Sequence, residues 1–454
     1  MRIPSVVRSF ATVFRSAGHQ CHLVGGAVRD LLLGRDLTDF DIATDARPEV
    51  VLGLFRRVIP TGIRHGTVTV LFRGTQFEVT TFRTDGDYSD GRRPDTVVFA
   101  PSIFDDLARR DFTINAMAYD LLADRLNDPH RGREDLKRGI LRAIGDPAQR
   151  FHEDGLRPLR ACRFAAQLAF TIEPATRAAI PGALPILARV SAERVRDEIL
   201  KILASTVPSV GLLAMQETGI LGVVLPELAE GIGVAQGDLH CYDVFHHSLY
   251  ACDAAPRESQ VLRLAALLHD VGKPRALGAG PGGRPTFYGH EKISTAMSQE
   301  ILTRLKLPGA VIKAVCHLVA NHMFNYQEEW TDAAVRRLIS KVGEASIGEL
   351  MALRRADQIG MCRENAGRFP EGLSQFAQRV EEVQRGSRAF TLRDLAASGT
   401  DLMERLGLRP GPEVGILLNE LLETVLEDPS LNERERLLQI AERMYHQRMA
   451  PGQR

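Results

Sequence analysis

Two aspartates separated by one residue, Asp39 and Asp41, are the starting point for any chemistry in this 454-residue chain. In a strand beginning near Phe40, residues two apart project from the same face, so both carboxylates can grip the same divalent ions while Phe40 faces the core. Glu78 can add a third carboxylate from a neighbouring strand. Carboxylate oxygens suit Mg²⁺. Two such ions would lower the pKa of an incoming hydroxyl and neutralise charge on a leaving pyrophosphate.

A glycine turn lies shortly before this pair, in the stretch LVGGAVRD. A strand that runs into Gly25 and Gly26 and then into a helix exposes backbone N–H groups to an anion, with no side chain in the way. Arg29, one turn along, can add a charge-assisted contact to a triphosphate. An isolated Asp-x-Asp pair also fits a solvated loop in which Asp39 caps a turn, but the preceding glycine turn favours a nucleotide site.

The sequence pattern around these residues predicts a mixed α/β domain over roughly the first 145 residues. Arg73-Gly74 between two β-rich runs indicates a hairpin. Strands are predicted at 22–24, 40–43, 67–72 and 75–82, with helices at 27–33 and after Asp45 and Pro48. The N-terminal apolar residues recur at helical spacing, which predicts an amphipathic opening helix. Residues 84–94 are expected to form a mobile loop, and helical periodicity dominates after about residue 146.

The composition is that of an ordinary globular protein, with 44% hydrophobic and 25% charged residues. The chain is too long for one core, so we expect several domains. No apolar run approaches the ~20 residues that span a bilayer, so we expect no membrane partner. The formal net charge is zero, and RNA contacts must therefore come from local basic patches. Six cysteines without CxxC spacing predict neither a disulfide framework nor a zinc ribbon, and favour the cytoplasm.

Several motifs in a fixed order make the chain recognisable. They are LVGGAVRDLLLG and DFDIAT, FEVTTFR (77–83), RRDFTINAMA (109–118), DPHRGREDL (128–136) and RFHEDGLRPLRACRFAAQL (150–168). Together they resemble the class II tRNA nucleotidyltransferase and bacterial poly(A) polymerase superfamily over roughly the first 170 residues. The resemblance implies an α+β fold. A polymerase-beta-like nucleotidyltransferase head (1–145) would precede an all-helical neck (146–235), an HD-type body (236–365) and a tail (366–454).

The resemblance also implies roles for single residues. Gly26 and Arg29, with Gly25 in the same turn, match positions that contact the triphosphate, and Asp39 and Asp41 match the magnesium ligands. Arg110 matches a nucleotide-contacting arginine. Asp111 beside it is expected to help shape the active site.

The base-selecting motif of this family, EDxxR, is found here as Glu153-Asp154-Gly155-Leu156-Arg157. Asp154 and Arg157 are three residues apart and would share one face of a helix. A carboxylate accepts from an exocyclic amine, and a guanidinium donates to a ring nitrogen or carbonyl oxygen. Such a pair suits cytosine or adenine and leaves uracil and guanine mismatched. By spacing alone the pair also fits a helical salt bridge worth ~0.3–0.5 kcal/mol.

Pro158 limits where this helix can start, because a proline costs a helix interior ~3 kcal/mol unless it lies in the first turn. We therefore expect the helix to begin near Gly155. Arg160 and Arg163 continue the same stagger, and the resemblance implies that both contact the nucleotide.

A second set of residues could hold another metal. It consists of His247, His269, Asp270, His290, His322 and Asp357. Its order resembles the H…HD…H…H…D pattern of the HD phosphohydrolase superfamily. Imidazole with carboxylate suits Mn²⁺, Ni²⁺ or Fe²⁺ better than Mg²⁺. His246 or His317 can replace a neighbour as ligand, His240 is expected to be structural, and the body can also serve only as scaffold and RNA support.

Four functions remain open. The leading one is addition of CCA to tRNA 3′ ends from CTP and ATP in the cytoplasm, with no DNA partner. The second is A-only addition or polyadenylation, which the same motifs fit. The third is an HD-type metal-dependent phosphohydrolase acting on RNA ends, and the fourth is non-catalytic RNA binding. A Gly411-Pro412 turn in the tail is either a tRNA phosphate contact or a plain connection.

Overall fold

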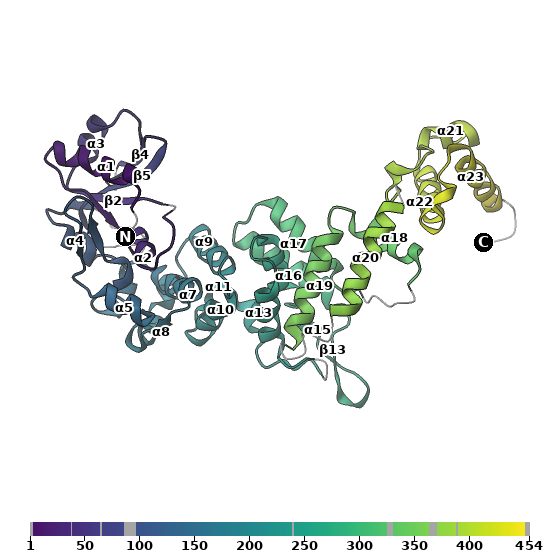
Figure 1. Cartoon of the computed structure of the whole chain (residues 1–454). Coiled ribbons are helices and arrows are strands. Elements are labelled where there is room, and N and C mark those ends of the chain that lie inside the picture. The colour runs from purple at the N-terminus through teal and green to yellow at the C-terminus, as the bar shows by residue number, and fades with distance from the viewer. Residues whose placement is uncertain are drawn as a thin grey trace. The chain divides into compact units, whose positions relative to one another are not determined.

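The computed structural model describes residues 3–37, 39–63, 66–85, 97–237, 240–324, 330–362, 370–386 and 389–449 (Figure 1). The chain forms two compact units. The first is Met1–Ala229 with Arg304–Lys306, and the second is Glu230–Thr303 with Leu307–Arg454. The boundary at residue 229 falls close to the predicted end of the neck at 235. The finer divisions at 145 and 365 stay predictions.

A seven-stranded sheet forms the centre of the head, in the order β3-β4-β5-β2-β1-β8-β9. Its strands are β1 His22–Val24, β2 Asp41–Thr44, β3 Val58–Gly62, β4 Thr67–Phe72, β5 Thr75–Thr81, β8 Ala118–Asp120 and β9 Arg125–Asn127. Strands β2 and β5 pair in parallel, with Asp41 opposite Glu78. Strand β1 pairs antiparallel with both β2 and β8. The predicted α+β class is confirmed, and the sheet places Asp41 on a central strand with Glu78 beside it.

Aromatic side chains pack on one buried face of this sheet. Helix α1 (Ser5–Ser16) buries Phe10, whose ring stacks on Phe77 at 4.0 Å, and the Phe40 ring lies 5.3 Å from Phe77. Side chains alternate along a strand, so Glu78 projects from the opposite face. The predicted opening helix is therefore confirmed, and Phe40 faces the core as expected.

The predicted hairpin is also confirmed. Arg73 and Gly74 between β4 and β5 both have positive φ, at 49° and 80°, as a two-residue hairpin turn requires. The predicted helices at 27–33 and after Pro48 are α2 (Gly26–Leu32) and α3 (Pro48–Leu54). Of the expected loop, Thr84 and Asp85 belong to β6 (Arg83–Asp85), which pairs with β7 (Val97–Phe99). Residues 86–94 lie outside the described residues.

The rest of the first unit is mainly helical. Its elements are α4 Ile103–Ala108, α5 Gly132–Arg138, β10 Ile140–Leu141, α6 Pro147–Glu153, α7 Arg157–Leu168, β11 Thr171–Ile172, α8 Pro174–Leu187, α9 Ala192–Leu203, α10 Pro208–Glu217, α11 Ile220–Val224 and α12 Pro226–Ala229. Helix α7 packs against α9 and α10.

The base-selecting motif does not lie on one helix, so the shared helical face expected for Asp154 and Arg157 is wrong, whereas the expected helix start near Gly155 agrees with the observed start to within two residues. Helix α6 ends at Glu153, Asp154 has extended backbone (φ −140°, ψ 108°), and α7 begins at Arg157. Gly155, between the two helices, lies so close to Ile186 that a Cβ there would come within 2.8 Å of its side chain. Pro158 does lie in the first turn of α7, as expected.

Helices make up most of the second unit, drawn in teal, green and yellow in Figure 1. They are α13 Val244–Ala254, α14 Gln260–Leu268, α15 Lys273–Ala276, α16 His290–Arg304, α17 Gly309–Asn321, α18 Asp332–Val342, α19 Ile347–Met361, α20 Pro370–Gly386, α21 Gly399–Leu406, α22 Pro412–Glu427 and α23 Arg434–Met449. The Gly/Pro-rich loop after α15 forms a small hairpin of β12 (Gly278–Ala279) and β13 (Pro285–Thr286). None of the helices in the described ranges is long and apolar enough to cross a membrane.

The cysteine spacing did not predict the one disulfide found among the described residues. Cys241 and Cys362 form a disulfide, with Cα atoms 5.1 Å apart, although 121 residues separate them in sequence. The bond joins the segment before α13 to the end of α19. These two helices pack closely, since a Cβ on Gly360 would lie 2.7 Å from the backbone nitrogen of Ala251.

Candidate nucleotide site and candidate metal centre

A cavity of about 560 Å³ in the first unit gathers most of the predicted nucleotide-site residues. The predicted residues that line it are Gly25, Gly26, Arg29, Asp39, Asp41, Arg110, Asp111, Asp154, Arg157, Arg160 and Arg163. Sequence reasoning missed five lining residues, which are Arg109, Asn115, Phe164, Gln167 and Lys201. Glu78 and Glu153 are not among the described residues that line the cavity.

The carboxylates near the glycine turn have the electrostatics of a cation site. Burial raises the pKa of Asp41, and the neighbouring charges of Glu78 and Asp39 raise it further, while the Arg110 guanidinium opposes them. Carboxylates that repel one another are stabilised by a divalent cation with oxygen ligands. The donor set therefore fits a hard divalent ion. Glu78 contributes through its charge from the paired strand.

Gly25 is the position where the backbone requires glycine. It has φ +67° and ψ −134°, and precedes α2 directly. A Cβ there would lie 2.8 Å from Nη1 of Arg110 and 3.7 Å from Oδ2 of Asp41. The missing side chain thus lets the Arg110 guanidinium approach the turn, and keeps the backbone near the carboxylate open to a ligand.

Asn115 holds the residues around this turn in place. Its Oδ1 accepts a hydrogen bond from Nη1 of Arg29 at 2.8 Å, and its backbone oxygen accepts one from Nη1 of Arg110 at 3.4 Å. Its Nδ2 donates to Oδ1 of Asp111 at 3.1 Å. Asn115 belongs to the RRDFTINAMA motif, so the motif itself was the signal that could have identified it.

Asp111 connects the head to helix α7. Its Oδ2 accepts from Nε and Nη2 of Arg160 at 2.8 and 2.5 Å, and its Oδ1 accepts from the backbone nitrogen of Phe112. Burial acts to raise the pKa of Asp111, but the Arg160 guanidinium and the hydrogen bond from Asn115 outweigh it and hold the pKa well below 3.8. Asp111 is therefore a charged, buried support for Arg160.

The base-selecting residues are held by separate partners. Nη1 of Arg157 donates to Oε2 of Glu153 at 2.6 Å and to the backbone oxygen of Arg150 at 2.8 Å. Its Nη2 donates to the backbone oxygen of Arg109 at 2.9 Å. Glu153, predicted to bind the nucleotide, instead supports Arg157. The Asp154 carboxylate lies on the cavity wall beside Arg157.

Three arginines surround one aromatic ring in this cavity. The guanidinium carbons of Arg29, Arg160 and Arg163 lie 5.3, 5.5 and 4.0 Å from the centroid of Phe164. Burial lowers the pKa of Arg163 to about 10, with the nearby charge of Arg160 acting in the same direction. The face of an aromatic ring attracts cations, so Phe164 helps to keep like charges together. Such a cluster suits a polyphosphate.

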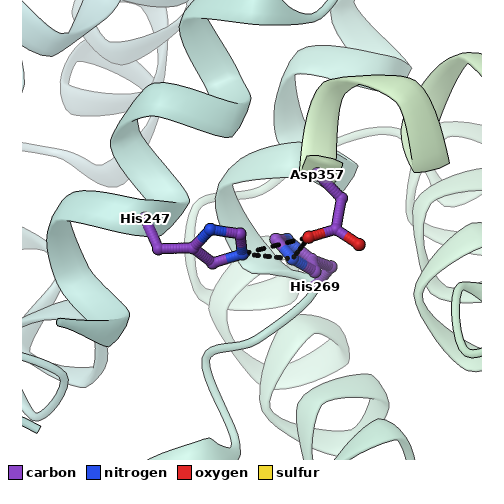
Figure 2. A group of neighbouring side chains, drawn as sticks. All are labelled: His247, His269 and Asp357. Atoms are coloured by element: carbon purple, nitrogen blue, oxygen red, sulfur yellow. Dashed lines mark hydrogen bonds and ion pairs between the residues drawn. The ribbon is translucent and has the colours of Figure 1, made fainter. Parts of the chain in front are cut away.

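The six residues of the second predicted set converge in the second unit, and all are buried. They form two groups whose ligand atoms lie within 4.8 Å of one another, His247 with His269 and Asp357, and Asp270 with His290 and His322. Figure 2 shows the first group, with His247 on α13, His269 at the end of α14 and Asp357 on α19.

Asp270 belongs to the second group and also faces the first. Its Oδ2 is 3.2 Å from Nε2 of His247 and 3.3 Å from Nε2 of His269. Its Oδ1 is 3.2 Å from Nε2 of His290 and 3.6 Å from Nε2 of His322. One carboxylate therefore faces both groups, one oxygen to each.

Backbone contacts set the orientation of three rings. Nδ1 of His269 lies 2.8 Å from the oxygen of Ala266, and Nδ1 of His290 lies 2.8 Å from that of Phe287. Nδ1 of His322 is likewise 2.7 Å from a carbonyl oxygen, that of Val319. When Nδ1 donates to a carbonyl, Nε2 keeps the lone pair that binds a metal.

The facing Nε2 atoms fit a cation. Those of His247 and His269 are 3.1 Å apart, and those of His290 and His322 are 3.3 Å apart. Burial acts to lower the pKa of His269, but the charges and hydrogen bonds of Asp270 and Asp357 together outweigh it and raise the pKa to about 10. The buried centre thus calls for bound positive charge, which protons or a metal can supply.

The alternative ligands lie elsewhere. Nδ1 of His246 pairs with Asp243 at 2.8 Å, and Nε2 of His317 lies 2.6 Å from the oxygen of Val342. The His240 ring is 5.2 Å from that of His247, but both of its nitrogens are buried without a hydrogen-bond partner among the described residues. Its expected structural role stays a prediction.

Because the mixed sheet presents its carboxylates beside a turn suited to phosphate, the first unit has the head of a polymerase-beta-like nucleotidyltransferase. Family models match at residues 21–142 (poly A polymerase head domain), 169–232 (probable RNA and SrmB-binding site of polymerase A) and 287–441 (putative tRNA nucleotidyltransferase domain 2).

Two curated relatives cover nearly the whole chain. An A-adding tRNA nucleotidyltransferase of Deinococcus radiodurans is 37% identical, over 88% of this chain and 90% of the relative. A CCA-adding enzyme of Geobacillus stearothermophilus is 35% identical over 92% of each. The crystal structure of the Bacillus stearothermophilus CCA-adding enzyme in complex with CTP matches with a TM-score of 0.77 and 30% identity over 99% of each chain. The chain therefore belongs to the tRNA nucleotidyltransferase and poly(A) polymerase family, whose members use divalent metal ions.

Proposed function

We propose that this protein adds CCA to tRNA 3′ ends from CTP and ATP and releases pyrophosphate. The observation that carries the proposal is the single cavity that holds the glycine turn, the carboxylates and the Asp154–Arg157 pair. The CCA-adding relatives support it. So does the likeness to a CCA-adding enzyme in complex with CTP.

In this proposal Asp39 and Asp41 hold Mg²⁺, with Glu78 adding negative charge from the paired strand. When bound, the metal supplies charge neutralisation at the phosphates and a lowered pKa for the attacking hydroxyl. Arg29 and Arg110 bind and orient the triphosphate over the glycine turn. The position of Arg110 against Gly25 supports this role, because it brings a guanidinium to the same wall as Asp41.

Asp154 and Arg157 select the base. An ionised carboxylate only accepts hydrogen bonds, and a guanidinium only donates them. Cytosine and adenine present an amine beside a ring acceptor, which matches this order, whereas uracil and guanine present a carbonyl oxygen where the amine is needed. A site built around such bonds disfavours an analogue that leaves its polar groups unpaired. Protein side chains thus take the place of a template.

The test uses a tRNA transcript that lacks its terminal CCA, with CTP, ATP or both in the presence of Mg²⁺. Two cytidines followed by one adenosine support the proposal. Adenosine added only to a CC-ended transcript would identify an A-adding enzyme, as the Deinococcus radiodurans relative is named, and a long adenosine tail would identify a poly(A) polymerase. Asp41→Asn should abolish incorporation. Asp124→Asn, at an exposed head carboxylate paired with Arg8, is the matched control.

The tRNA 3′ end is the proposed partner, and the cytoplasm is the proposed location. The Gly411-Pro412 turn supports a tail contact, since α22 begins at Pro412 and directs backbone N–H groups outward from its first turn. Salt-dependent tRNA binding by the wild type and by a Gly411→Glu variant would test that contact.

A second activity is proposed for the buried centre: metal-dependent hydrolysis of phosphate esters at RNA ends. The two groups bridged by Asp270 support it, because their ligands suit Mn²⁺, Ni²⁺ or Fe²⁺. Metal content after exchange into each ion is the primary readout, with hydrolysis of a 2′,3′-cyclic phosphate as the second.

Neighbouring histidines provide a matched pair of variants for this centre. His247→Gln should lose bound metal, whereas His246→Gln, at a position that pairs with Asp243 outside the centre, should keep it. Equal metal content in both variants would refute the metal centre. Bound metal without hydrolysis would leave a structural ion and refute the second activity.

A further inference from the structure

His240 lies beside the candidate metal centre in the second unit without being one of its candidate ligands. Its ring centroid is 5.2 Å from that of His247, and the two ring planes cross at 86°. The ligand atoms of each candidate group lie within 4.8 Å of one another, and neither group, as found among the described residues, includes a His240 nitrogen. His240 is therefore a neighbour of the candidate ligands.

The His240 ring is close to both groups of candidate ligands. Burial lowers the pKa of His240 to about 4, and the charge of Lys273 acts in the same direction. The carboxylates of Asp270 and Asp357, one from each group, act against it. Charges influence a group in this way only when they are near, so a molecule bound between the two groups would be within reach of this ring.

The ring nitrogens of His240 are not used by the described fold. Both are buried, and neither has a hydrogen-bond partner among the described residues. An imidazole carries at least one N–H donor, whichever nitrogen holds the proton. A buried polar atom without a partner destabilises a fold, so such atoms are rare away from sites that use them. The structural role expected for His240 from the sequence does not account for this arrangement.

The next residue in the chain fixes the position of His240. The backbone nitrogen of Cys241 donates to the oxygen of Met361 at 2.9 Å, and the disulfide from Cys241 to Cys362 joins the same place to the end of α19. Since α19 also carries Asp357, these two ties hold His240 beside the helix that provides a candidate ligand.

A further tie runs from Gln236 to the centre itself. Its Oε1 accepts from Nζ of Lys273 at 2.7 Å, and the same Nζ lies 2.6 Å from Oδ2 of Asp270. The buried ammonium of Lys273 is therefore already paired on two sides. The His240 ring, by contrast, is a donor without a partner among the described residues.

We propose that His240 binds the substrate of the second centre, where one ring N–H donates a hydrogen bond to a non-bridging oxygen of a phosphate ester. This inference rests on the proposed second activity and adds to it a binding residue that is not a metal ligand. A phosphate oxygen is a charged acceptor, and a hydrogen bond to it is stronger than one between neutral groups. The same bond gives a partner to a nitrogen that has none among the described residues.

The test uses the full chain loaded with Mn²⁺, and measures the Kd for inorganic phosphate and the KM for a 2′,3′-cyclic phosphate. His240→Met removes the ring nitrogens and keeps an apolar side chain of similar length. We expect both constants to rise about 10- to 100-fold, the worth of one hydrogen bond to a charged acceptor, with an unchanged metal content.

His317→Gln is the matched control, because Nε2 of His317 lies 2.6 Å from the oxygen of Val342, outside the centre. This variant should keep the wild-type Kd and KM. The nucleotide cavity is the same in both variants, so any phosphate bound there contributes equally and the difference between them reports on the second centre.

Thermal melting separates a substrate contact from a structural ring. Because the ring nitrogens have no partner to lose among the described residues, His240→Met should melt no lower than the wild type. A His240→Met protein that does not fold, or that melts lower and binds phosphate normally, would mark a structural residue and overturn the inference. His240→Gln keeps an amide N–H and should bind phosphate more tightly than His240→Met, whereas equal affinities would overturn the donor role.

Metal content keeps the remaining failures apart. Loss of metal from His240→Met would make His240 a ligand and overturn the inference while the metal centre stands. A wild type that takes up no metal would refute the proposed second activity, and the inference with it. If the wild type binds metal and phosphate and His240→Met binds both equally well, the proposed activity stands and the role of His240 is refuted.

Discussion

Replacing Gly25 by alanine should damage activity far more than stability. The backbone there has φ +67° and ψ −134°, a conformation that residues with a Cβ rarely adopt, so the change should cost about 1–3 kcal/mol of folding free energy. The new Cβ would lie 2.8 Å from Nη1 of Arg110, whereas ordinary contact begins at 3.4 Å. Arg110 must therefore retreat by about 0.6 Å, which its flexible side chain can do.

This displacement of Arg110 should slow catalysis, because Arg110 is proposed to orient the triphosphate beside Asp41. A displacement near 1 Å can cost about 100-fold in rate, so a shift of this size should lower kcat/KM for CTP by about 10- to 100-fold. The Cβ would also lie 3.7 Å from Oδ2 of Asp41, which adds crowding at the metal-binding wall.

Gly34 is the matched control for this substitution. It lies just after α2, the helix that Gly25 precedes. It has φ +71°, and a Cβ there would meet no atom within 4 Å. Gly34→Ala should therefore lose stability through its backbone, but keep kcat/KM. Urea unfolding measures the first quantity and incorporation of labelled CTP the second. If Gly25→Ala retains kcat/KM within about threefold of Gly34→Ala, the argument from Arg110 is wrong.

Three other changes have definite expected outcomes. Asp111→Asn should cost about 1.5–3 kcal/mol at pH 7, because the half-buried Arg160 loses its charge partner and its charge-assisted hydrogen bonds. The Asp111 pKa is held below 3.8, so this stabilisation is present above that pH and is lost as acid protonates the carboxylate; the deficit in urea unfolding should shrink toward low pH. Reducing the Cys241–Cys362 bond should lower the melting temperature of the second unit, because closing a loop of about 100 residues contributes about 4.7 kcal/mol. A Cys241→Ser protein should melt equally with and without dithiothreitol. Phe164→Leu should raise KM for both CTP and ATP, since each cation–π contact it removes is worth about 0.5–1 kcal/mol. KM values equal to those of the wild type would contradict the role of Phe164 in holding the arginines together.

Features set by neighbouring residues were predictable from the sequence. The Arg73-Gly74 hairpin and the Gly25 turn follow from backbone preferences that a few residues decide. The position of Glu78 on a strand next to that of Asp41 was predictable for a related reason. Both lie in β-rich runs of the same short domain, and the parallel pairing of β2 with β5 brings them together.

The helical face expected to carry both Asp154 and Arg157 was wrong for the opposite reason. The spacing of Asp154 and Arg157 fits one helix, but α6 ends at Glu153 and α7 begins at Arg157, and Gly155 between them packs against Ile186. Ile186 is on α8, and Arg194, the partner of Asp154, is on α9. Only tertiary packing decides such contacts, and a local pattern carries no information about them.

The disulfide could not be predicted from the sequence for the same reason. Cys241 and Cys362 are 121 residues apart and belong to no spacing motif, so their pairing depends on how α13 packs against α19. His247 and Asp357 lie on the same two helices, yet their convergence was predicted. The difference is that six metal-binding side chains in a recognisable order carry information that two isolated thiols do not.

The two candidate sites also differ in what the fold must provide. In the nucleotide cavity Arg160 is tied to Asp111 and Arg157 to Glu153, so the cations are held by protein partners and the wall keeps its shape while nucleotides are exchanged. In the second centre the Nε2 atoms of His290 and His322 face each other at 3.3 Å in a buried site, while the Nδ1 atom of each ring lies beside a backbone carbonyl oxygen. Facing lone pairs in a low-dielectric interior are unfavourable unless positive charge lies between them. A nucleotide site can therefore be complete before its ligand arrives, whereas the second centre needs a cation or protons as part of its folded structure.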